Sequence, residues 1–387
     1  MAYVKSPFRA FIHFVLLVVL LVGVSPVIKS QTQVDTKQTT EFVKVGQKIE
    51  QEIKGLNSHS YKLTLKPRQY LQLFLETQKL AVEVNIIAPS GENVLHIETD
   101  KKEINRETLE VIAKGLGNYL VEVISLDDIA EPSRYKIEVK EIRRALLKDK
   151  NRCRAKELTN QANILQKIGT PVGLEKSVER YLTALPYWQK ASEQNAIADV
   201  YRKLAESYYL ISKYQESINY FTKELEIRRS NKDRSREARS IKNLGIVYYA
   251  MGDDEQALKY YNQALELGKE LSNREIIAQT LNFLGTLYRS NGEGRKSIEY
   301  NKQSLTIWEE LNETEETAKI TQDLATSYYS LAEVKDALGF YEKTLLVAEK
   351  ENNKGSQAKI LSSIAVIYDE IGNFSHAIAY YEKALSV

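Results

Sequence analysis

The chain has 387 residues, of which 43% are hydrophobic and 27% charged, a composition typical of folded domains and a length that allows two or three of them. Its 54 basic and 52 acidic residues leave a formal charge of +2, which excludes bulk electrostatic attraction to nucleic acid or to an anionic membrane. The single cysteine, Cys153, excludes a disulfide framework and a thiolate metal site.

Residues 1–30 have the pattern of a secretory signal peptide. Lys5 and Arg9 form a positive end, residues 11–24 are an apolar run, and a polar stretch follows. This run is shorter than the roughly 20 residues that cross a bilayer. We therefore expect an exported protein, periplasmic or secreted, with a polar linker at residues 31–40. The alternative is a protein anchored in the membrane by an uncleaved signal segment.

Residues 41–142 alternate apolar and polar side chains, which is the pattern of strands with one buried face. The alternating apolar residues are Tyr61, Leu63, Leu65, Leu71, Leu73, Leu75, Val82, Val84, Ile86, Tyr119, Val121, Val123, Tyr135, Ile137 and Val139. Turn-forming residues such as Pro67, Gly115 and Pro132 separate these runs. Seven or eight short strands with no helix between them predict an antiparallel β-sandwich of the jelly-roll kind.

Several short segments of this region carry a family resemblance. They are Gly46 to Gly55, Ser60 to Leu63, Gln69 to Leu71, Pro89 to Gly91 and Gly117 to Tyr119. Together they resemble the bacterial pre-peptidase C-terminal domain, a jelly-roll module of secreted proteins. The resemblance implies an architecture similar to that of carbohydrate-binding domains, but the tyrosines of the region fall mostly on the core side of their strands.

The β region has few candidate metal ligands. His59 and His96 lack the spacing that would supply three ligands, and we interpret them as surface or strand-edge residues. Asp127 and Asp128 have the oxygen ligands that calcium prefers, but a polar loop before Pro132 explains them equally well. We therefore expect no metal and no cofactor.

Two segments are rich in basic residues. Residues 143–157 predict an exposed connecting helix, in which acidic residues and the lack of aromatic residues argue against nucleic-acid binding. Residues 228–239 include Asp233 and Glu237 and are interpreted as a solvated turn. The alternative for this second segment is a docking patch for an acidic partner, which salt would weaken.

From residue 158 to residue 387 one pattern returns every 40 residues. One column of the pattern is Leu204, Leu244, Leu284, Leu324 and Ile364, and a second column, four residues later, is Tyr208, Tyr248, Tyr288, Tyr328 and Tyr368. Each copy has two stretches with apolar residues three and four positions apart, which predicts two helices. Gly252, Gly292 and Gly372 end first helices, and Ser212 and Ala332 are expected to do so less well.

The residues of each copy resemble the tetratricopeptide repeat. In one copy they are Leu244, Gly245 and Tyr248 on the first helix, Gly252 at the turn, and Ala257, Tyr261, Ala264 and Leu265 on the second helix. The resemblance covers residues 158–387, with about five full repeats and one degenerate repeat, and the period is similar to that of the kinesin light chain subgroup. It implies a right-handed α-helical solenoid whose first helices line a concave ligand-binding surface, in a multidomain, mostly α protein.

The resemblance also indicates which first-helix positions face the groove: one and two residues before the leucine column, and five residues after it. The candidate partner-binding residues at these positions are Lys242, Asn243, Tyr249, Asn282, Arg289, Gln322 and Tyr329. Amide side chains offer both a donor and an acceptor to a peptide backbone, and tyrosines offer large contact area with little entropy loss. The alternative is that these side chains form a solvated face without a ligand.

The sequence contains no catalytic motif. It has no Gly-x-Ser-x-Gly elbow, no phosphate-binding loop, no His-Glu-x-x-His and no Cys/His pair. We therefore expect a non-enzymatic, exported scaffold that binds a peptide or protein segment in the groove. Carbohydrate binding by the β-sandwich is a weaker alternative.

The order of the domains suggests another alternative. It is similar to the N-terminal part of bacterial proteins that continue into a caspase-like CHAT protease, so the chain would be the recognition arm of a larger protease. The last predicted helix reaches Val387 without a polar capping helix, which leaves dimerisation or a longer protein open.

Overall fold

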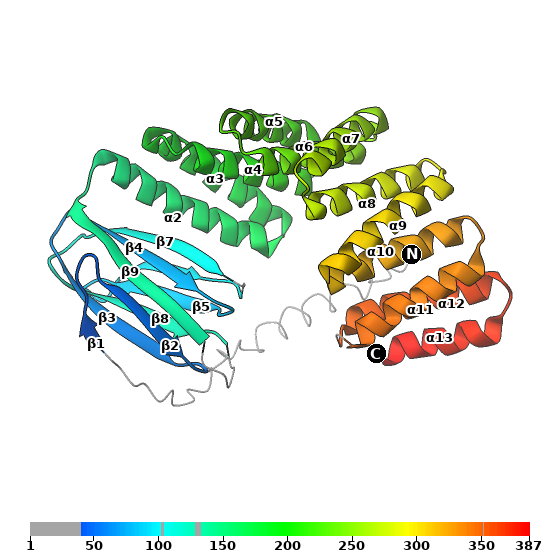
Figure 1. The fold of residues 1–387 in the computed structure, drawn as a ribbon, viewed down its shortest axis with the longest axis horizontal. Coiled ribbons are helices and arrows are strands. Elements are labelled where there is room, and N and C mark those ends of the chain that lie inside the picture. The colour runs from blue at the N-terminus through cyan, green and yellow to red at the C-terminus, as the bar shows by residue number, and fades with distance from the viewer. Residues whose placement is uncertain (1–39, 102–103, 128–132, 351) are drawn as a thin grey trace, which may run out of the picture. The chain divides into compact units, whose positions relative to one another are not determined.

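The computed structural model describes residues 40–101, 104–127, 133–350 and 352–387 (Figure 1). These residues form two compact units, which divide between Leu146 and Leu147. The expected signal peptide and nearly all of the expected linker lie outside the described residues. Within the described ranges, none of the helices combines the length and the hydropathy that crossing a bilayer requires.

The first unit is built from strands. Its described residues form β1 (Thr40–Phe42), β2 (Lys48–Ile53), β3 (Ser58–Leu65), β4 (Gln69–Thr77), β5 (Val82–Ile87), β6 (Asn93–Glu98), β7 (Asn105–Ile112), β8 (Gly117–Ser125) and β9 (Ser133–Arg144). One sheet has the order β1-β3-β8-β5-β6 and the other β2-β9-β4-β7. The predicted antiparallel β domain is confirmed, although β1 and β3 pair in parallel.

Apolar residues from both sheets share one core. Leu63 of β3 lies opposite Tyr119 of β8 in the ladder, and both side chains are buried. The alternation of apolar and polar residues directs every second side chain inward, where each fully buried large apolar side chain contributes about 1.5–3 kcal/mol of transfer free energy.

The expected connecting helix at residues 143–157 is corrected. Strand β9 continues to Arg144, and helix α2 begins at Leu147, so the charged segment contains a strand end and the first half of a repeat helix. It is also not uniformly exposed, because Ala155 is fully buried and Asp149 is 2% exposed. Apolar residues of α2 at three- and four-residue spacing pack against the next helix, and this packing holds the charged residues between them in place.

The second unit consists of helices in its described residues. They are α2 (Leu147–Ile168), α3 (Pro171–Ala191), α4 (Gln194–Leu210), α5 (Tyr214–Ser230), α6 (Arg234–Met251), α7 (Asp254–Glu270), α8 (Arg274–Ser290), α9 (Gly294–Leu311), α10 (Thr314–Ser330), α11 (Val334–Lys350), α12 (Lys354–Glu370) and α13 (Phe374–Ser386). Even-numbered helices are the first helices of the repeats and odd-numbered helices the second. The predicted helical array of five full repeats and one earlier copy is confirmed, with α2 and α3 forming the earlier copy.

Side-chain packing explains why both sequence columns recur. The leucine column is buried, with Leu204, Leu284 and Leu324 fully so. The tyrosine column stacks on aromatic residues of the second helix: the ring centroids of Tyr248 and Tyr260, for example, are 5.2 Å apart with the planes at 10°. The column therefore recurs because each repeat joins its two helices through one aromatic pair.

Each turn between the two helices of a repeat contains one residue in the left-handed conformation. Gly252 has φ of 81°, and Ser212 and Ala332 take the same conformation with φ of 59° and 57°. This conformation costs about 1–2 kcal/mol for a residue with a Cβ, whereas glycine adopts it without that cost. Ser212 and Ala332 thus end their helices as predicted, with the conformational cost that the sequence led us to expect.

Candidate functional site

Side chains connect the first helices from one repeat to the next. The amide of Gln166 on α2 donates to the hydroxyl of Ser207 on α4 at 2.9 Å. Helix α8 approaches both α6 and α10. We call the side of the array on which these side chains lie the first-helix face. All seven candidate partner-binding residues lie on first helices, namely α6, α8 and α10.

Lys242 belongs to the interior of this face. It is only 8% exposed, its Nζ donates to Oε1 of Gln279 on α8 at 2.6 Å, and it lies 5.6 Å from the ring centre of Phe283. Burial lowers its pKa to about 8. We expected this side chain to project away from the buried residues, but helix α8 covers it, so Lys242 links two repeats.

Three more candidates bridge neighbouring repeats. The amide of Asn282 donates to Asp323 on α10 at 2.9 Å, and Arg289 lies 3.7 Å from the other carboxylate oxygen of Asp323. The hydroxyl of Tyr329 donates to Glu370 on α12, and this bond raises the pKa of Tyr329 to about 12. These side chains already have partners within the array, and a ligand would have to share or replace them.

The side chains of Asn243, Tyr249 and Gln322 make no hydrogen bond with any other described residue. Tyr249 is half-buried against the apolar core. Gln322 is exposed and lines a pocket of about 500 Å³ between α10, α11 and α12. Asn243 lines a different pocket, which has an apolar floor.

The pocket at Asn243, which we call the α4–α6 pocket, has a volume of about 340 Å³. It is lined by Gln166, Glu206, Tyr209, Leu210, Phe221, Asn243, Ile246 and Val247. Five of these side chains are apolar or aromatic, and they come from α4, α5 and α6. A concave apolar site with a few polar groups at its edge has the composition of a ligand-binding pocket.

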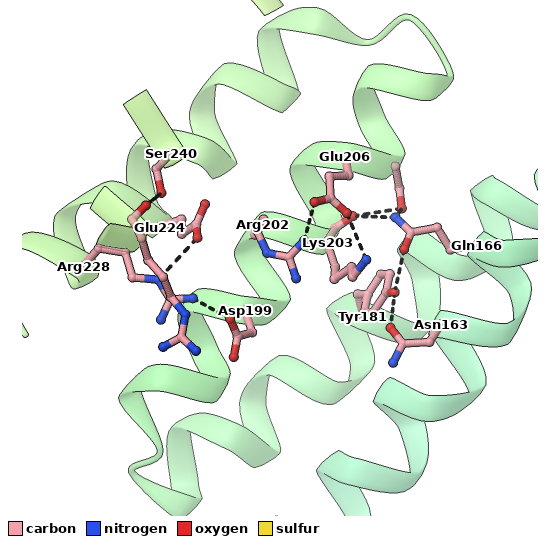
Figure 2. Close-up of polar contacts among 12 residues, drawn as sticks. Asn163, Gln166, Tyr181, Asp199, Arg202, Lys203, Glu206, Glu224, Arg228 and Ser240 are labelled. Atoms are coloured by element: carbon pink, nitrogen blue, oxygen red, sulfur yellow. Dashed lines mark hydrogen bonds and ion pairs between the residues drawn. The ribbon is translucent and has the colours of Figure 1, made fainter. Parts of the chain in front are cut away.

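The repeat pattern explains why this site is open. Phe221 occupies the position that Tyr181 has in the preceding repeat. The hydroxyl of Tyr181 donates to Asn163 at 2.6 Å and is 3.2 Å from Gln166, and so it fills the space beside α2 (Figure 2). Phe221 has no hydroxyl to direct toward Glu206, which is the counterpart of Gln166 in this repeat. The equivalent space beside α4 therefore stays open.

The polar groups at the edge of the pocket differ in whether they already have partners within the protein. Glu206 pairs with Arg202 and, at 3.0 Å, with Lys203, so its carboxylate is neutralised (Figure 2). The amide of Asn243 and the hydroxyl of Tyr209 make no hydrogen bond with another described residue, and burial raises the pKa of Tyr209. The pocket therefore offers an apolar floor with an uncharged donor and acceptor beside it.

The basic run at residues 228–239 is solvent-exposed at five of its six basic residues, as the sequence suggested for a solvated turn, and Arg228 is the exception. Arg228 is fully buried, with Nη2 2.5 Å from Asp199 and Nε 3.3 Å from Glu224 (Figure 2). Arg234 pairs with Glu270 at 2.8 Å. Acidic residues of the same and of other helices pair with these two arginines, which also weakens the alternative of a docking patch for an acidic partner.

The tyrosines of the β unit lie in its core. Tyr61, Tyr70, Tyr119 and Tyr135 are all at most 4% exposed, so none of them forms the exposed aromatic platform that carbohydrate binding would favour. No group of three His, Cys, Asp or Glu residues in the described ranges is placed to hold a metal ion.

The aspartate and histidine candidates of the β unit have protein partners. Asp127 accepts the backbone N–H of Ala81 at 3.2 Å and pairs with Lys101, while Asp128 lies outside the described residues. His96 lies 2.9 Å from Asn85. These contacts stabilise loops and strand edges.

Sequence reasoning identified Asn243 but missed the apolar floor beneath it. The available signal was the column that reads Tyr181, Phe221, Tyr261, Asn301 and Tyr341. Phe221 is the one residue in this column that is apolar throughout, and it marks the repeat in which the pocket is open.

Comparison with known proteins agrees with this fold. The tetratricopeptide repeat family matches residues 196–270, 276–350 and 316–387. No curated protein matches the chain in sequence. A signal transduction ATPase with a tetratricopeptide repeat sensor, from Pyrococcus horikoshii, has a TM-score of 0.52 at 17% identity, over 62% of this chain and 36% of that one.

Two Rap structures are more loosely similar. The apo form of RapI has a TM-score of 0.49 at 17% identity, over 60% of this chain and 96% of that one. The Rap conjugation gene regulator of plasmid pLS20, in complex with the Phr* peptide, has a TM-score of 0.47 at 16% identity, over 62% and 74%. The family match and the paired helices together show that residues 196–387 contain tetratricopeptide repeats arranged as a helical solenoid.

Proposed function

We propose that the chain is a non-catalytic scaffold that binds an extended peptide or protein segment along its first-helix face. The α4–α6 pocket carries the proposal, because it combines an apolar floor with an amide that has no partner among the described residues. One apolar side chain of the ligand occupies the pocket. The amide of Asn243 binds the adjacent peptide backbone, to which it offers both a donor and an acceptor.

The bridging residues have a supporting role in this proposal. Lys242 and Asn282 hold α6, α8 and α10 at fixed spacing. A groove whose helices are already fixed loses little conformational entropy when a ligand binds, so more of the contact energy appears as affinity. Their substitution therefore weakens binding indirectly.

The test is a selection from a display library of random peptides on the native chain, followed by affinity measurement of the selected peptides. Asn243→Ala should lower their affinity about tenfold, the effect of losing roughly 1.4 kcal/mol. Asn262→Ala is the matched control, because Asn262 is exposed on the second helix α7. Equal affinities of the Asn243→Ala variant and the native chain would refute the proposal.

The proposal includes export of the scaffold, with residues 1–30 as signal peptide and the β unit as a second module related to pre-peptidase C-terminal domains. Its support is the sequence pattern of a positive end, an apolar run and a polar stretch. The intact mass of the native protein in cell fractions tests this. A species outside the cytoplasm that lacks residues 1–30 supports export, and a much heavier species supports the protease-arm alternative.

A further inference from the structure

A second pocket lies between α10, α11 and α12, and we call it the α10–α12 pocket. Its volume is about 500 Å³, and its lining residues are Glu315, Ala318, Lys319, Gln322, Thr344, Ala348, Asn353, Ser356 and Ile360. Thr344, Ala348 and Ile360 are buried and form its floor, whereas the charged and amide side chains at its edge are exposed. This volume is in the range of small-molecule sites, which is about 300–1,000 Å³.

In the preceding repeat a tryptophan fills the corresponding space. The residue 40 positions before Ala348 is Trp308 on α9, which is buried. Trp308 belongs to one core cluster with Ala278 and Ile320. The counterparts of the latter two residues, one repeat later, are the alanine of α10 and the isoleucine of α12 that line the pocket. An indole ring therefore packs, one repeat earlier, where the α10–α12 pocket lies.

The repeat before that one fills the same space from the following helix. Gly268 on α7 is the counterpart of Trp308, and a Cβ at Gly268 would lie 3.2 Å from Cγ2 of Ile276 on α8. The counterpart of Ile276 on α12 is Ser356. In the α10–α12 pocket both of these positions therefore carry small side chains, Ala348 and Ser356.

One column of alanines shows the effect of this difference. Ala198, Ala238 and Ala278 on the earlier first helices are fully buried. Ala318 on α10 is partly exposed, although α11 packs on α10 and α12 packs on α11 as the equivalent helices do in the earlier repeats. The pocket is therefore specific to this repeat, and the size of its side chains is the reason.

The charges at the edge of the pocket favour an uncharged ligand. Lys319 is the one basic residue in the lining, and it pairs with Glu315 and with Glu316, each at 2.9 Å. Its charge is therefore already neutralised, and an anionic ligand would have to compete with two carboxylates for it.

The pocket also contains a partner for the N–H of an aromatic ring. At the position of Trp308, the first repeat has Trp188, whose indole N–H donates to Thr159 on the first helix of that repeat at 3.0 Å. In the α10–α12 pocket the first helix supplies Gln322, whose amide has no hydrogen-bond partner among the described residues. The oxygen of this amide can accept a ring N–H.

We propose that the α10–α12 pocket binds a small, uncharged aromatic molecule of the size of indole. Its ring lies on the floor of the pocket, as the ring of Trp308 packs in the preceding repeat, and its N–H donates to Gln322. The pocket shares no lining residue with the α4–α6 pocket, so this inference goes beyond peptide binding and does not depend on it. A bound ring restores the packing between α11 and α12 and stabilises the array.

Isothermal titration calorimetry of the native chain with indole tests the proposal. We expect a dissociation constant of about 0.1–1 mM, as ligands of this size allow, and a melting temperature that rises with the indole concentration. Indole-3-acetate should bind more weakly, because the pocket lining offers no unpaired cation. A native chain that binds no indole, or that prefers the anion, overturns the proposal.

Two variants copy the side chains with which other repeats fill this space. Ala348→Trp copies Trp308, and Ser356→Ile copies Ile276. Each should remove indole binding, while circular dichroism shows that the helical array remains folded. Leu346→Trp is the matched control and should bind indole as the native chain does, because Leu346 is exposed on α11 and does not line the pocket. Indole binding that persists in both filled variants refutes the site.

Two further measurements use the native chain and do not depend on the folding of a variant with a filled pocket. The methyl resonance of Ile360, assigned with the help of Ile360→Val, should shift when indole is added, and binding without this shift would place the ligand elsewhere and overturn the proposal. N-acetyltryptophanamide distinguishes a free molecule from the side chain of a peptide. If this compound binds and indole does not, the pocket accepts a peptide side chain and the small-molecule site is refuted.

Discussion

The ring of Tyr261 on α7 lies directly against the backbone of Gly245 on α6. A Cβ added at residue 245 would lie 2.6 Å from two carbons of this ring. The ring of Tyr261 also stacks on Phe283 of α8, at a centroid distance of 5.7 Å, so it cannot move away from Gly245 without disturbing this second contact. Gly245 therefore sets how closely the two helices of its repeat approach.

Gly245→Ala should destabilise the array although alanine is the better helix former. The added methyl group displaces the ring of Tyr261 from Phe283, and overpacking of this kind costs about 1–3 kcal/mol. Chemical denaturation measures the change. Gly339→Ala on α11 is the control, because a Cβ there has no neighbour within 4 Å, and it should stabilise by about 0.5–1 kcal/mol. The interpretation fails if both variants are stabilised.

Arg228→Ala should be among the most destabilising single changes in the array. It leaves Glu224, which is 1% exposed, without its cation, and such a loss costs about 3–5 kcal/mol. Arg234→Ala, whose side chain is 45% exposed beside Glu270, should cost less than about 1 kcal/mol. Thermal and urea unfolding compare the two variants, and similar losses would show that Arg228 does not act through the buried pair.

Glu224 should make stability depend on pH. Burial raises its pKa from 4.5 to about 7 in the folded chain, against the opposing effect of Arg228. Between these values the folded chain binds more protons than the unfolded chain, so this residue lowers the free energy of unfolding as pH rises from about 4.5 to about 7.

Glu224→Gln removes this proton equilibrium. Its unfolding free energy relative to the native chain should therefore increase over the same pH window, by an amount of the order of 1–3 kcal/mol. Urea titrations at several pH values measure the difference between the two proteins. A difference that stays constant with pH would mean that the carboxylate titrates normally in the folded state.

Phe221→Tyr should close the α4–α6 pocket. The added hydroxyl points where that of Tyr181 points in the preceding repeat, so it should meet Glu206 and fill the space proposed for the ligand side chain. Peptides selected on the native chain should lose about tenfold in affinity, while stability changes by less than about 1.5 kcal/mol. Tyr181→Phe is the reciprocal control, since it should weaken stability but leave peptide affinity unchanged.

Local and periodic information in the sequence determined the elements of this fold. The alternation from Tyr61 to Val139 set the strands, because side chains of a strand point to opposite faces. The 40-residue columns at Leu204 and Tyr208 set the helix pairs, because the same face must meet the same neighbour in every repeat. The sequence placed the end of the β unit slightly too early, since charge density in residues 143–157 does not distinguish a strand end from a repeat helix.

The tertiary structure decided which of the candidate residues already have partners within the array. Lys242 and Asn243 are adjacent on α6 and equally polar, yet Lys242 is covered by α8 and binds Gln279, whereas Asn243 lines the α4–α6 pocket. Likewise Arg228 and Arg229 are neighbours in one basic run, but only Arg228 is buried among acids of α4 and α5. Periodicity assigns a residue to a side of its helix, but the side chains of the next helix determine whether it meets solvent, because their size and charge vary from repeat to repeat.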